Sequence, residues 1–591
     1  MKLLKTQDKL CALRKKMDTA GVTAVIIPNA DPHQSEYLAG YWQILKWLTG
    51  FSGSAGTAVV TKNQAGMWTD FRYWIQAGAQ LDGVQLFRQG DTGVPSFDKW
   101  LTDTLSVNDR IALDGKIVSA SQAGSLKEKF MQKGIVVDTT MDLISDLWQD
   151  RPPMPRTPAF ELDSIYAGET RKEKISRIRK KMADYNTDCH VLAALDDIAW
   201  TFNLRGQDIH TNPVNMAFSL ITMDKINLFI DPAKVNTPLR TALEADGVAL
   251  FDYNFFYETI QKLDKKSRVL LDTEKVSDFI YQAVKKRSDI TEAPNPSAML
   301  KCLKNEVEIS HIRDTAVKDG RAVVNFLHWL CTSDTPKTEI SAAQQLLNFR
   351  KEQNAFLHPS FDSIMAFKEH SAICHYSADP DTDLPLSPDA MFLTDSGGNY
   401  LTGTTDITRT VHLGTPSSQE IRDYTLVLKA HIAVATALFP STARGYQIDA
   451  MARRHLWQQG LDFGHGTGHG VGFFLCVHEG PARLSSLPVD IALRPGMLLT
   501  NEPGLYREGQ YGIRLENMVL VVKERETQFG SFLKFENMTL CHFERDLVDK
   551  TMLGAEEISW VNEYHQMVYD RLSPGLAEPV REWLGSRTRP L

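Results

Sequence analysis

The sequence predicts an α/β fold, of the α+β kind, with two related N-terminal domains followed by a larger C-terminal domain. The chain has 591 residues, which is enough for about three domains of roughly 100–200 residues each. Proline-bearing stretches interrupt it at 150–160 and 293–300, and proline is excluded from helix interiors and central strands. We therefore predict domains at 1–155, 156–300 and 301–591.

The first two segments follow one plan of elements. Each opens with a charged helical stretch, continues with a short apolar strand, and closes on a strand that ends in aspartate. These stretches are LRKKMDTAG, TAVIIP (23–28) and GMWTD (66–70), then SRIRKKMADYNTD, HVLAAL (190–195) and INLFID (226–231). The shared plan predicts an internal duplication of an α/β unit. The periodicity of residues 304–330 predicts a long helix at the start of the third segment.

Charge and cysteine content exclude several classes of protein. The formal net charge is −8 and no basic stripe occurs, so nucleic acid is not an expected partner. The seven cysteines are scattered and form no CxxC pair, which argues against a disulfide framework or a thiolate zinc site. The first 21 residues carry charges throughout, and no run of 18 apolar residues occurs. We therefore expect no secretory signal, no membrane span and a cytoplasmic location.

Four carboxylates stand out in the third segment. Asp395 and Asp406 flank a turn-rich stretch within 392–414, and a hairpin there could bring both onto one face. Taken alone, Asp395 could equally cap the turn and Asp406 could be solvated. Glu502 precedes a Pro-Gly turn, and Glu516 lies in the apolar stretch GIRLENMVLVV. A carboxylate in such surroundings is costly unless it is paired or bound to metal.

A histidine accompanies these carboxylates. His375 ends the apolar, strand-like stretch IMAFKEHSAICHY, and alone it could be a structural histidine. Four carboxylates and one imidazole together suit a pair of divalent ions that share bridging carboxylates. Oxygen-rich ligation with a single nitrogen favours Mn(II), Co(II), Fe(II) or Zn(II) over Cu(I), and calcium has little use for the histidine.

Residues 464–472 read GHGTGHGVG, with glycine at every second position. This spacing does not match the GxGxxG fingerprint, so no dinucleotide cofactor is expected, and so much glycine excludes a HExxH zinc helix. In an extended chain the glycines would face one side, and His465 and His469 the other. Four residues of strand span roughly 13 Å, so at most one of these histidines binds a given ion. The bare glycine face would let another segment or a substrate backbone approach closely.

The complete set of motifs resembles the pita-bread metallopeptidases. The stretches DSGGNYLTGTTDITRT, GHGTGHGVGFFLCVHEGP and NEPGLYREGQYGIRLEN are similar to the catalytic core of the aminopeptidase P (X-Pro aminopeptidase) family in its long, three-domain cytosolic form. ADPHQSEYLAG, TGFSGSAGTAVVT and MWTDFRYWIQA resemble its first domain, and ISWVNEYHQ resembles its tail. The resemblance implies two creatinase-like α/β domains followed by a pita-bread catalytic domain.

The resemblance also implies the metal ligands. Asp395 and Asp406 would bind one ion, Asp406 and Glu516 would bridge to a second, and His469 and Glu502 would complete the second site. In this family the ions are a Mn(II) pair, with Co(II) or Zn(II) as possible substitutes. They hold a water or hydroxide between them and lower its pKa to give the nucleophile.

Other residues receive roles by the same resemblance. Glu502 would accept a proton and return it to the leaving proline nitrogen. His478 would stabilise the oxyanion, and His375 and His465 would line the substrate cleft near the proline. Arg514 would orient ligand carboxylates. A purely structural role for His478 or Arg514 is the alternative.

The implied activity is release of the N-terminal residue from peptides with proline in second position, by an enzyme that forms a homodimer through its catalytic domain. Two alternatives accompany this hypothesis. A prolidase-like X-Pro dipeptidase shares the ligands, but prolidases usually carry a bulky residue where this chain has Gly470. A non-catalytic pita-bread binding protein would have lost ligands, whereas all five are present here.

Overall fold

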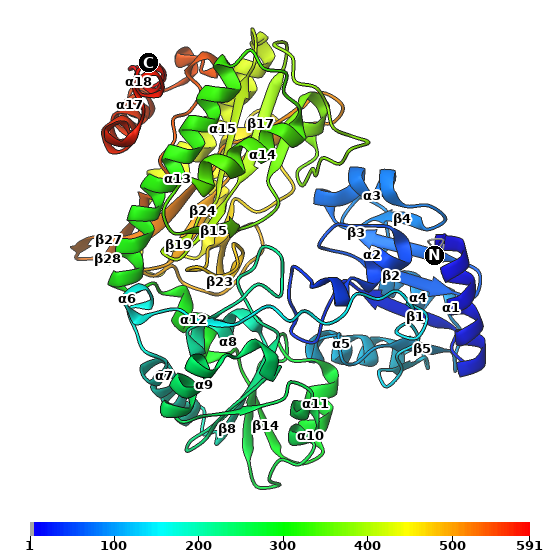
Figure 1. Ribbon diagram of the computed structural model, residues 1–591. Coiled ribbons are helices and arrows are strands. Elements are labelled where there is room, and N and C mark those ends of the chain that lie inside the picture. Colours follow the sequence, from blue (N-terminus) through cyan, green and yellow to red (C-terminus); the bar gives the residue numbers. More distant parts are fainter. Residues whose placement is uncertain (1–4) are drawn as a thin grey trace. The chain divides into compact units, whose positions relative to one another are not determined.

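The computed structural model describes residues 5–591 and divides into two compact units (Figure 1). The first unit takes the chain up to Asp163 together with Glu169–Ala298. The second comprises Ser164–Gly168 and Met299–Leu591. The proline-rich stretch at 150–160 contains no helix, and β7 (Phe160–Glu161) begins only at its last residue. The three-domain division at 155 and 300 stays a prediction.

The first sheet of the first unit has six strands in the order β4-β3-β2-β1-β5-β6. Its central strand alternates between two cores. Val25 and Ile27 pack with residues of α1 and α2, whereas Ala24 and Ile26 pack with residues of α4 and α5. Helices therefore cover both faces of the sheet. The strands are β1 (Ala24–Pro28), β2 (Thr57–Thr61), β3 (Ala65–Thr69), β4 (Gln85–Arg88), β5 (Arg110–Leu113) and β6 (Val136–Asp138), and the helices are α1 (Thr6–Ala20), α2 (Ile44–Thr49), α3 (Trp74–Gln80), α4 (Phe97–Thr104) and α5 (Ala120–Met131).

The second sheet repeats this topology. Its order is β12-β11-β10-β8-β13-β14, and each neighbouring pair has the same direction as its counterpart in the first sheet. The predicted duplication is thus confirmed. The strands are β8 (Cys189–Leu192), β10 (Ala217–Thr222), β11 (Ile226–Ile230), β12 (Val248–Phe251), β13 (Arg268–Leu271) and β14 (Asp289–Glu292), and the helices are α7 (Arg171–Asp184), α8 (Leu195–Phe202), α9 (Thr237–Ala245), α10 (Phe255–Ile260) and α11 (Asp278–Lys285).

Two local predictions in this unit were wrong. Residues 190–195 do not form one strand, because β8 ends at Leu192 and Leu195 begins α8. A short apolar run does not distinguish a buried strand from the start of a buried helix. Nor do the aspartate-ending strands close each segment, since three more strands follow in each sheet and all of them pair in parallel.

The second unit opens with the predicted long helix. It is α13 (Glu306–Thr332), which follows α12 (Pro296–Cys302). The Asn305 side chain caps its first turn while Glu308 reaches back to the Asn305 backbone, a reciprocal capping box. The second proline-bearing stretch, 293–300, is partly helical because α12 begins within it. Pro296 is the first residue of α12, where a missing N–H costs nothing.

The described part of the second unit contains four sheets. Two are small, with the orders β15-β18-β19 and β25-β26, and the other two contain Asp395 and His469. In one sheet the order is β16-β17-β20, and in the largest it is β21-β28-β27-β24-β22-β23. The strands are β15 (Phe356–Pro359), β16 (Ile364–Phe367), β17 (Met391–Ser396), β18 (Gly398–Tyr400), β19 (Gly403–Thr404), β20 (Ile407–His412), β21 (Leu438–Pro440), β22 (Gly468–Gly470), β23 (Glu479–Leu484), β24 (Leu498–Asn501), β25 (Gly504–Arg507), β26 (Tyr511–Arg514), β27 (Asn517–Thr527) and β28 (Gly530–Asn537).

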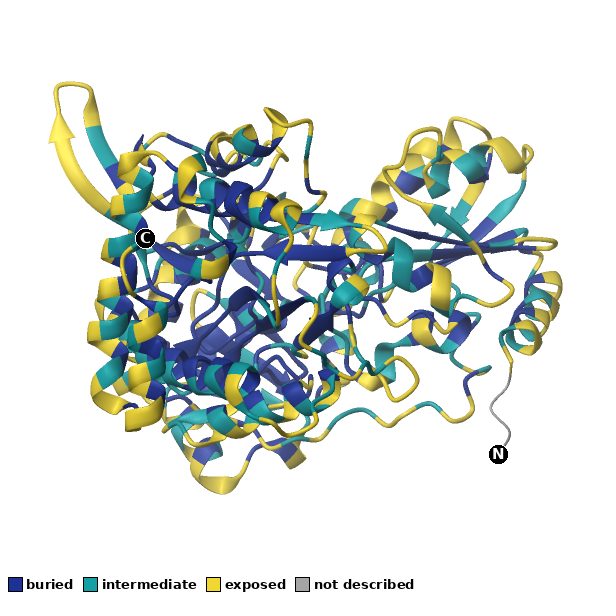
Figure 2. Ribbon diagram, turned by 90° about the horizontal axis from the view of Figure 1, so that it is seen from above, coloured by how far each residue is buried: buried dark blue, intermediate teal, exposed yellow. Residues whose placement is uncertain are grey.

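Helices pack against these strands to form the core of the unit. Val434 of α15 (Ser418–Ala435), Ile448 of α16 (Gly445–Trp457), Leu499 and Val519 belong to one apolar cluster. The remaining helices are α6 (Ser164–Ala167), α14 (Glu339–Lys351), α17 (Ala555–Leu572) and α18 (Glu578–Arg587). Figure 2 shows that most of the strands are buried and that exposed residues lie on the outer faces of the helices and in the turns. The far end of the hairpin of β27 and β28 is an exception, because it is exposed. Among residues 5–591, no helix is long and apolar enough to cross a membrane.

Candidate metal centre

The five predicted metal ligands lie on strands, or directly beside strand ends, in the second unit. Asp395 belongs to β17, Asp406 immediately precedes β20, and His469 is the middle residue of β22. Glu502 directly follows β24, and Glu516 lies between β26 and β27. The predicted hairpin at 392–414 forms, with β17 and β20 antiparallel and Asp395 opposite Thr408.

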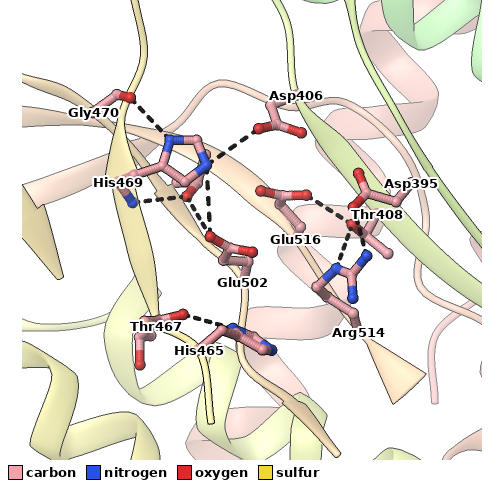
Figure 3. Close-up of polar contacts among 12 residues, drawn as sticks. Asp395, Asp406, Thr408, His465, Thr467, His469, Gly470, Glu502, Arg514 and Glu516 are labelled. Atoms are coloured by element: carbon pink, nitrogen blue, oxygen red, sulfur yellow. Dashed lines mark hydrogen bonds and ion pairs between the residues drawn. The ribbon is translucent and has the colours of Figure 1, made fainter. Parts of the chain in front are cut away.

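Three of these side chains place their ligand atoms close together. A ligand atom from each of Asp406, His469 and Glu516 lies within 4.8 Å of the other two. His469 Nε2 is 3.4 Å from Asp406 Oδ2 and 3.6 Å from Glu502 Oε1 (Figure 3). Asp395 joins this group through Arg514, whose Nη2 donates to Asp395 Oδ2 over 2.6 Å. The donor set is oxygen-rich with one nitrogen, which fits divalent first-row ions.

Burial separates the ligands into two groups. Asp395, Asp406 and Glu516 are 8%, 4% and 2% exposed, so Asp406 is not solvated. The side chains of His469 and Glu502 remain 21% and 18% exposed. His469 and Glu502 therefore form the accessible side of the group, and the other carboxylates form its floor.

Burial and neighbouring charges shift the pKa values of Glu516, Asp395 and His469. Burial raises the pKa of Glu516 well above its usual range, and the charges of Asp406 and Glu502 raise it further. Burial likewise raises the pKa of Asp395, against the lowering effect of Arg514. Burial lowers the pKa of His469, but its hydrogen bond to Asp406 and the charge of Glu502 outweigh this and raise it to about 9. Four ionised carboxylates in this volume need positive charge beside them, which divalent cations supply.

Arg514 and Thr408 orient the carboxylates. Arg514 Nε donates to Thr408 Oγ1 over 3.2 Å, and Thr408 Oγ1 donates to Glu516 Oε2 over 2.8 Å. The second carboxylate oxygen of Asp395, Oδ1, is buried and has no hydrogen-bond partner among the described residues. This oxygen is available to a cation, which further fits a metal centre.

His469 presents one nitrogen to the carboxylates. Its Nδ1 is 2.9 Å from the Gly470 carbonyl, which only accepts, so Nδ1 carries the proton and Nε2 faces Asp406. Its backbone N–H donates to Thr500 Oγ1 over 3.1 Å. The ring is therefore oriented by the contact at Nδ1, and the backbone of the same residue is held by Thr500.

The alternating glycines let neighbouring backbone approach. A Cβ on Gly468 would lie 1.9 Å from the Thr500 carbonyl oxygen, and one on Gly470 would lie 2.1 Å from that of Glu479. The extended conformation predicted for the whole stretch occurs only over Gly468–Gly470. Within β22 the glycines make room for the backbone of Thr500 and Glu479. Of the two predicted occupants, a chain segment or a substrate, a chain segment therefore lies against these glycines.

The three other histidines predicted for the site are His375, His465 and His478. All three are partly exposed, and each lies in different surroundings. His465 Nε2 is 2.8 Å from the Tyr506 hydroxyl, and Figure 3 shows its ring apart from that of His469. The His478 ring stands edge-on to His469, with centroids 4.3 Å apart. His375 does not end a strand as predicted, because β16 stops at Phe367 and a 3₁₀ turn (Lys368–Ala372) follows.

The loop that carries His375 is held by a buried carboxylate. Glu339, fully buried at the start of α14, accepts hydrogen bonds from the backbone N–H groups of Phe367 and Leu384, from the Tyr376 hydroxyl and from His370. Arg514 Nη2 also donates to the carbonyl of Cys374, the residue before His375, over 3.3 Å. The loop is thus tied to α14 and to Arg514.

Sequence reasoning missed Thr408 and Tyr506. Thr408 follows Asp406 by two residues in a strand, so period-two alternation could have placed both on one face. The Tyr506 hydroxyl accepts from Arg514 Nη1 over 2.7 Å and also contacts His465. The position of Tyr506, four residues after Glu502, fits no sequence pattern that would have predicted these contacts.

Family models cover most of the chain. Residues 310–523 match metallopeptidase family M24, and residues 531–591 match the C-terminal region of that peptidase. Residues 9–146 and 150–308 match two models of the creatinase/prolidase N-terminal domain. The predicted fold class is thereby confirmed.

Full-length relatives and solved structures agree with these matches. Xaa-Pro aminopeptidase 1 of Dictyostelium discoideum is 35% identical, over 99% of this chain and 96% of its own. Aminopeptidase P2 of Arabidopsis thaliana is 36% identical, over 99% of this chain and 88% of its own. The crystal structure of X-prolyl aminopeptidase from Caenorhabditis elegans, "a cytosolic enzyme with a di-nuclear active site", superposes with a TM-score of 0.95 at 33% identity over all of both chains. A Pyrococcus horikoshii prolidase matches at 24% identity over 64% of this chain and all of its own (TM-score 0.50), a likeness that shows the fold. With this extent of similarity, the chain belongs to the Xaa-Pro aminopeptidase (aminopeptidase P) family within metallopeptidase family M24.

Proposed function

We propose that the protein is a metal-dependent aminopeptidase that releases the N-terminal residue from peptides with proline in second position. The observation that carries the proposal is the convergence of Asp406, His469 and Glu516 within 4.8 Å, with Glu502 and Asp395 joined to them, in a chain similar to Xaa-Pro aminopeptidases over its full length.

The donor set suits two divalent ions, and we propose manganese. Asp395 and Asp406 would hold one ion, Asp406 and Glu516 would bridge, and His469 and Glu502 would complete the second. When bound, such a pair supplies Lewis acidity and lowers the pKa of a coordinated water. The similar C. elegans enzyme, which is described as having a di-nuclear active site, supports two ions rather than one.

The protein's own groups then manage protons and orientation. Glu502, on the accessible side of the ligand group, would accept the proton of the attacking water and deliver it to the proline nitrogen as the bond breaks. His478, edge-on to His469, would donate a hydrogen bond to the oxygen of the tetrahedral carbon. Arg514 would keep Asp395 and Thr408 in place throughout.

Proline in second position explains a dedicated enzyme. An X-Pro bond is a tertiary amide without an N–H and with a ring on its nitrogen. We propose that His375 and His465, both partly exposed, face the proline side of the substrate. His465 is held there by Tyr506, which Arg514 holds in turn.

Three peptides test the proposal. The metal-depleted protein is reloaded with Mn(II) and given Arg-Pro-Pro, Arg-Pro and Arg-Ala-Ala. We expect cleavage of Arg-Pro-Pro between arginine and proline and no cleavage of Arg-Ala-Ala. Activity on Arg-Pro alone would identify a dipeptidase, and inactivity on all three would favour a binding protein.

Assembly and location belong to the same proposal. We propose a homodimer that forms through the catalytic domain and acts in the cytoplasm. None of the seven cysteines, all of which lie within residues 5–591, forms a disulfide, and this suits a reducing compartment. Light scattering coupled to gel filtration checks the dimer, and a mass of one chain, 66.4 kDa, would contradict it.

A further inference from the structure

Arg409 places a charged side chain in the interior of the second unit, beside the ligand Glu516. The residue lies in β20 and is 1% exposed. Its guanidinium donates to six oxygens: Nε to the His542 carbonyl (2.9 Å), Nη1 to the carbonyls of Thr408 (2.9 Å) and Glu516 (2.6 Å), and Nη2 to Asn517 Oδ1 (2.8 Å), the Cys541 carbonyl (2.7 Å) and the Tyr564 hydroxyl (3.2 Å). No carboxylate is among these six acceptors.

One group of acceptors belongs to the ligand segment. Glu516 lies between two strands, so a sheet ladder does not satisfy its carbonyl. Arg409 supplies that partner, while the Glu516 N–H donates to the Thr408 carbonyl over 3.1 Å. Arg409 Nη1 binds the Thr408 carbonyl as well, and Thr408 Oγ1 donates to the Glu516 carboxylate. Backbone and side chain of Glu516 are therefore set by one pair of adjacent residues.

The other group of acceptors belongs to the C-terminal segment. The carbonyls of Cys541 and His542 lie on an irregular stretch between β28 and α17. This stretch is held by the motif ISWVNEYHQ of α17, because the Tyr564 hydroxyl is 2.9 Å from the Thr539 carbonyl and His565 Nε2 accepts from the Phe543 N–H over 3.1 Å. The Phe543 ring also lies 4.5 Å from the guanidinium.

Only arginine suits this position. Its planar fork points donors in several fixed directions, and hydrogen bonds from a charged donor are stronger than those from neutral donors. Lysine has three donors on a single nitrogen, so it would not bridge the Glu516 carbonyl to the carbonyls of Cys541 and His542. A shorter side chain would leave buried carbonyls without partners.

We infer that Arg409 is a positioning residue for Glu516, and that the C-terminal segment from Met538 to Leu572 is part of the support of the metal centre. The inference rests on the proposed function, since it assumes that Glu516 binds metal. It gives the tail a role in metal affinity as well as in stability.

The test compares Arg409→Lys with a matched control. Arg205→Lys changes a buried arginine of the first unit that also donates to carbonyls, those of Ala199 and Leu204. Mn(II) affinity is measured by competition with a chelator, and thermal unfolding is followed in parallel. We expect Arg409→Lys to weaken Mn(II) binding by about 10- to 100-fold, the usual effect of removing a group that orients a ligand. Arg205→Lys should lower the melting temperature and leave the affinity unchanged.

Tyr564→Phe gives a milder second variant. It deletes the hydroxyl that joins α17 to Arg409 and should weaken Mn(II) binding less, in the same direction. Excess Mn(II) should restore peptidase activity to both site variants. It would not do so if the substitutions had caused the chain to misfold. If the wild type binds Mn(II) and both variants bind it equally well, the inference is wrong and the proposed function stands. If the wild type binds no divalent ion, both are wrong.

Discussion

Glu516 shows at the residue scale why this centre needs its surroundings. It is 2% exposed and lies between the fully buried Leu515 and Asn517. Moving a carboxylate into such surroundings costs several kcal/mol after relaxation. The Thr408 hydroxyl offsets part of that cost at Oε2, and cations would offset the rest. A carboxylate buried at this cost indicates a functional site rather than a contribution to stability.

The two histidines of the glycine-rich stretch should behave differently when removed. We expect His469→Ala to lose metal-dependent activity, because its Nε2 faces Asp406 and Glu502. His465→Ala should keep both ions, since its Nε2 contacts Tyr506 instead. The Mn content per chain after desalting measures this. Loss of metal from His465→Ala would refute the division of roles.

Gly468 should tolerate no side chain. The added Cβ of Gly468→Ala would meet the Thr500 carbonyl at 1.9 Å, and backbone has to move to relieve it. We expect a loss of about 1–3 kcal/mol in the free energy of unfolding, measured in urea. Gly124→Ala is the control, because its Cβ meets no atom within 4 Å and alanine favours the interior of α5. That variant should gain about 0.5–1 kcal/mol, and an equal response of both variants would contradict the steric explanation.

At the element scale, two pairs of strands and the first turn of α14 hold the residues of the candidate metal centre in place. The antiparallel pairing of β17 and β20 sets Asp395 opposite Thr408. The antiparallel pairing of β22 and β24 brings Glu502 beside His469. The loop between β16 and β17 is different, because it has few ladder bonds of its own. Glu339 replaces these bonds by accepting four hydrogen bonds from the loop and its flanks.

Glu339→Gln should therefore loosen the loop around His375. Glutamine has one acceptor oxygen instead of two, so at least one buried donor loses its partner, at about 1–3 kcal/mol. We expect faster hydrogen exchange over residues 367–384 and a higher KM for Arg-Pro-Pro, with both ions still bound. Glu352→Gln, exposed at the end of the same helix, is the matched control. Unchanged exchange in Glu339→Gln would rule out this anchoring role.

At the scale of the whole molecule, the second unit is closed by its own C-terminal helices. Val561, Val568 and Leu572 of α17 belong to the same apolar cluster as Val427 of α15 and Leu515, the neighbour of Glu516. Burial of this extent removes histidines from solvent as well. His565 of α17 is 0% exposed, and its Nε2 accepts from Phe543.

This burial predicts a loss of stability in acid. Burial, with the charges of Arg409 and Arg545, lowers the pKa of His565 to about 3, against about 6.5 in the unfolded chain. Between these values the unfolded chain binds a proton that the folded chain excludes, so stability falls as pH falls, by about 1.4 kcal/mol per pH unit. Above pH ~6.5 the effect is absent.

Urea unfolding at pH 7 and pH 5 measures this contribution. His565→Gln keeps an acceptor for the Phe543 N–H but does not titrate. We expect the variant to lose about 2 kcal/mol less than the wild type over this interval. His210→Gln, at an exposed histidine, should leave the pH dependence unchanged. Identical slopes for wild type and His565→Gln would disprove the prediction.

Local pattern predicted much of this fold and site. The duplicated α/β units, the long helix and the hairpin at 392–414 all follow from periodicity and turn residues within short windows. The end of β8 and the turn before His375 did not, because a short apolar run is compatible with a strand or a helix. Arg409 was missed for another reason: its partner Tyr564 is 155 residues away in the chain, and no short pattern reports such a contact.

By itself, the sequence determined the α/β class and the duplication. It also predicted the set of four carboxylates and one histidine, and a limit of one metal-binding histidine among two. These depend on residue type and local spacing, which the chain carries at every position. Only the tertiary structure decided which carboxylates form the floor of the centre, what the glycines make room for, and that the C-terminal segment reaches Glu516 through Arg409. These depend on the packing of strands from distant parts of the chain, where burial and long-range hydrogen bonds set the outcome.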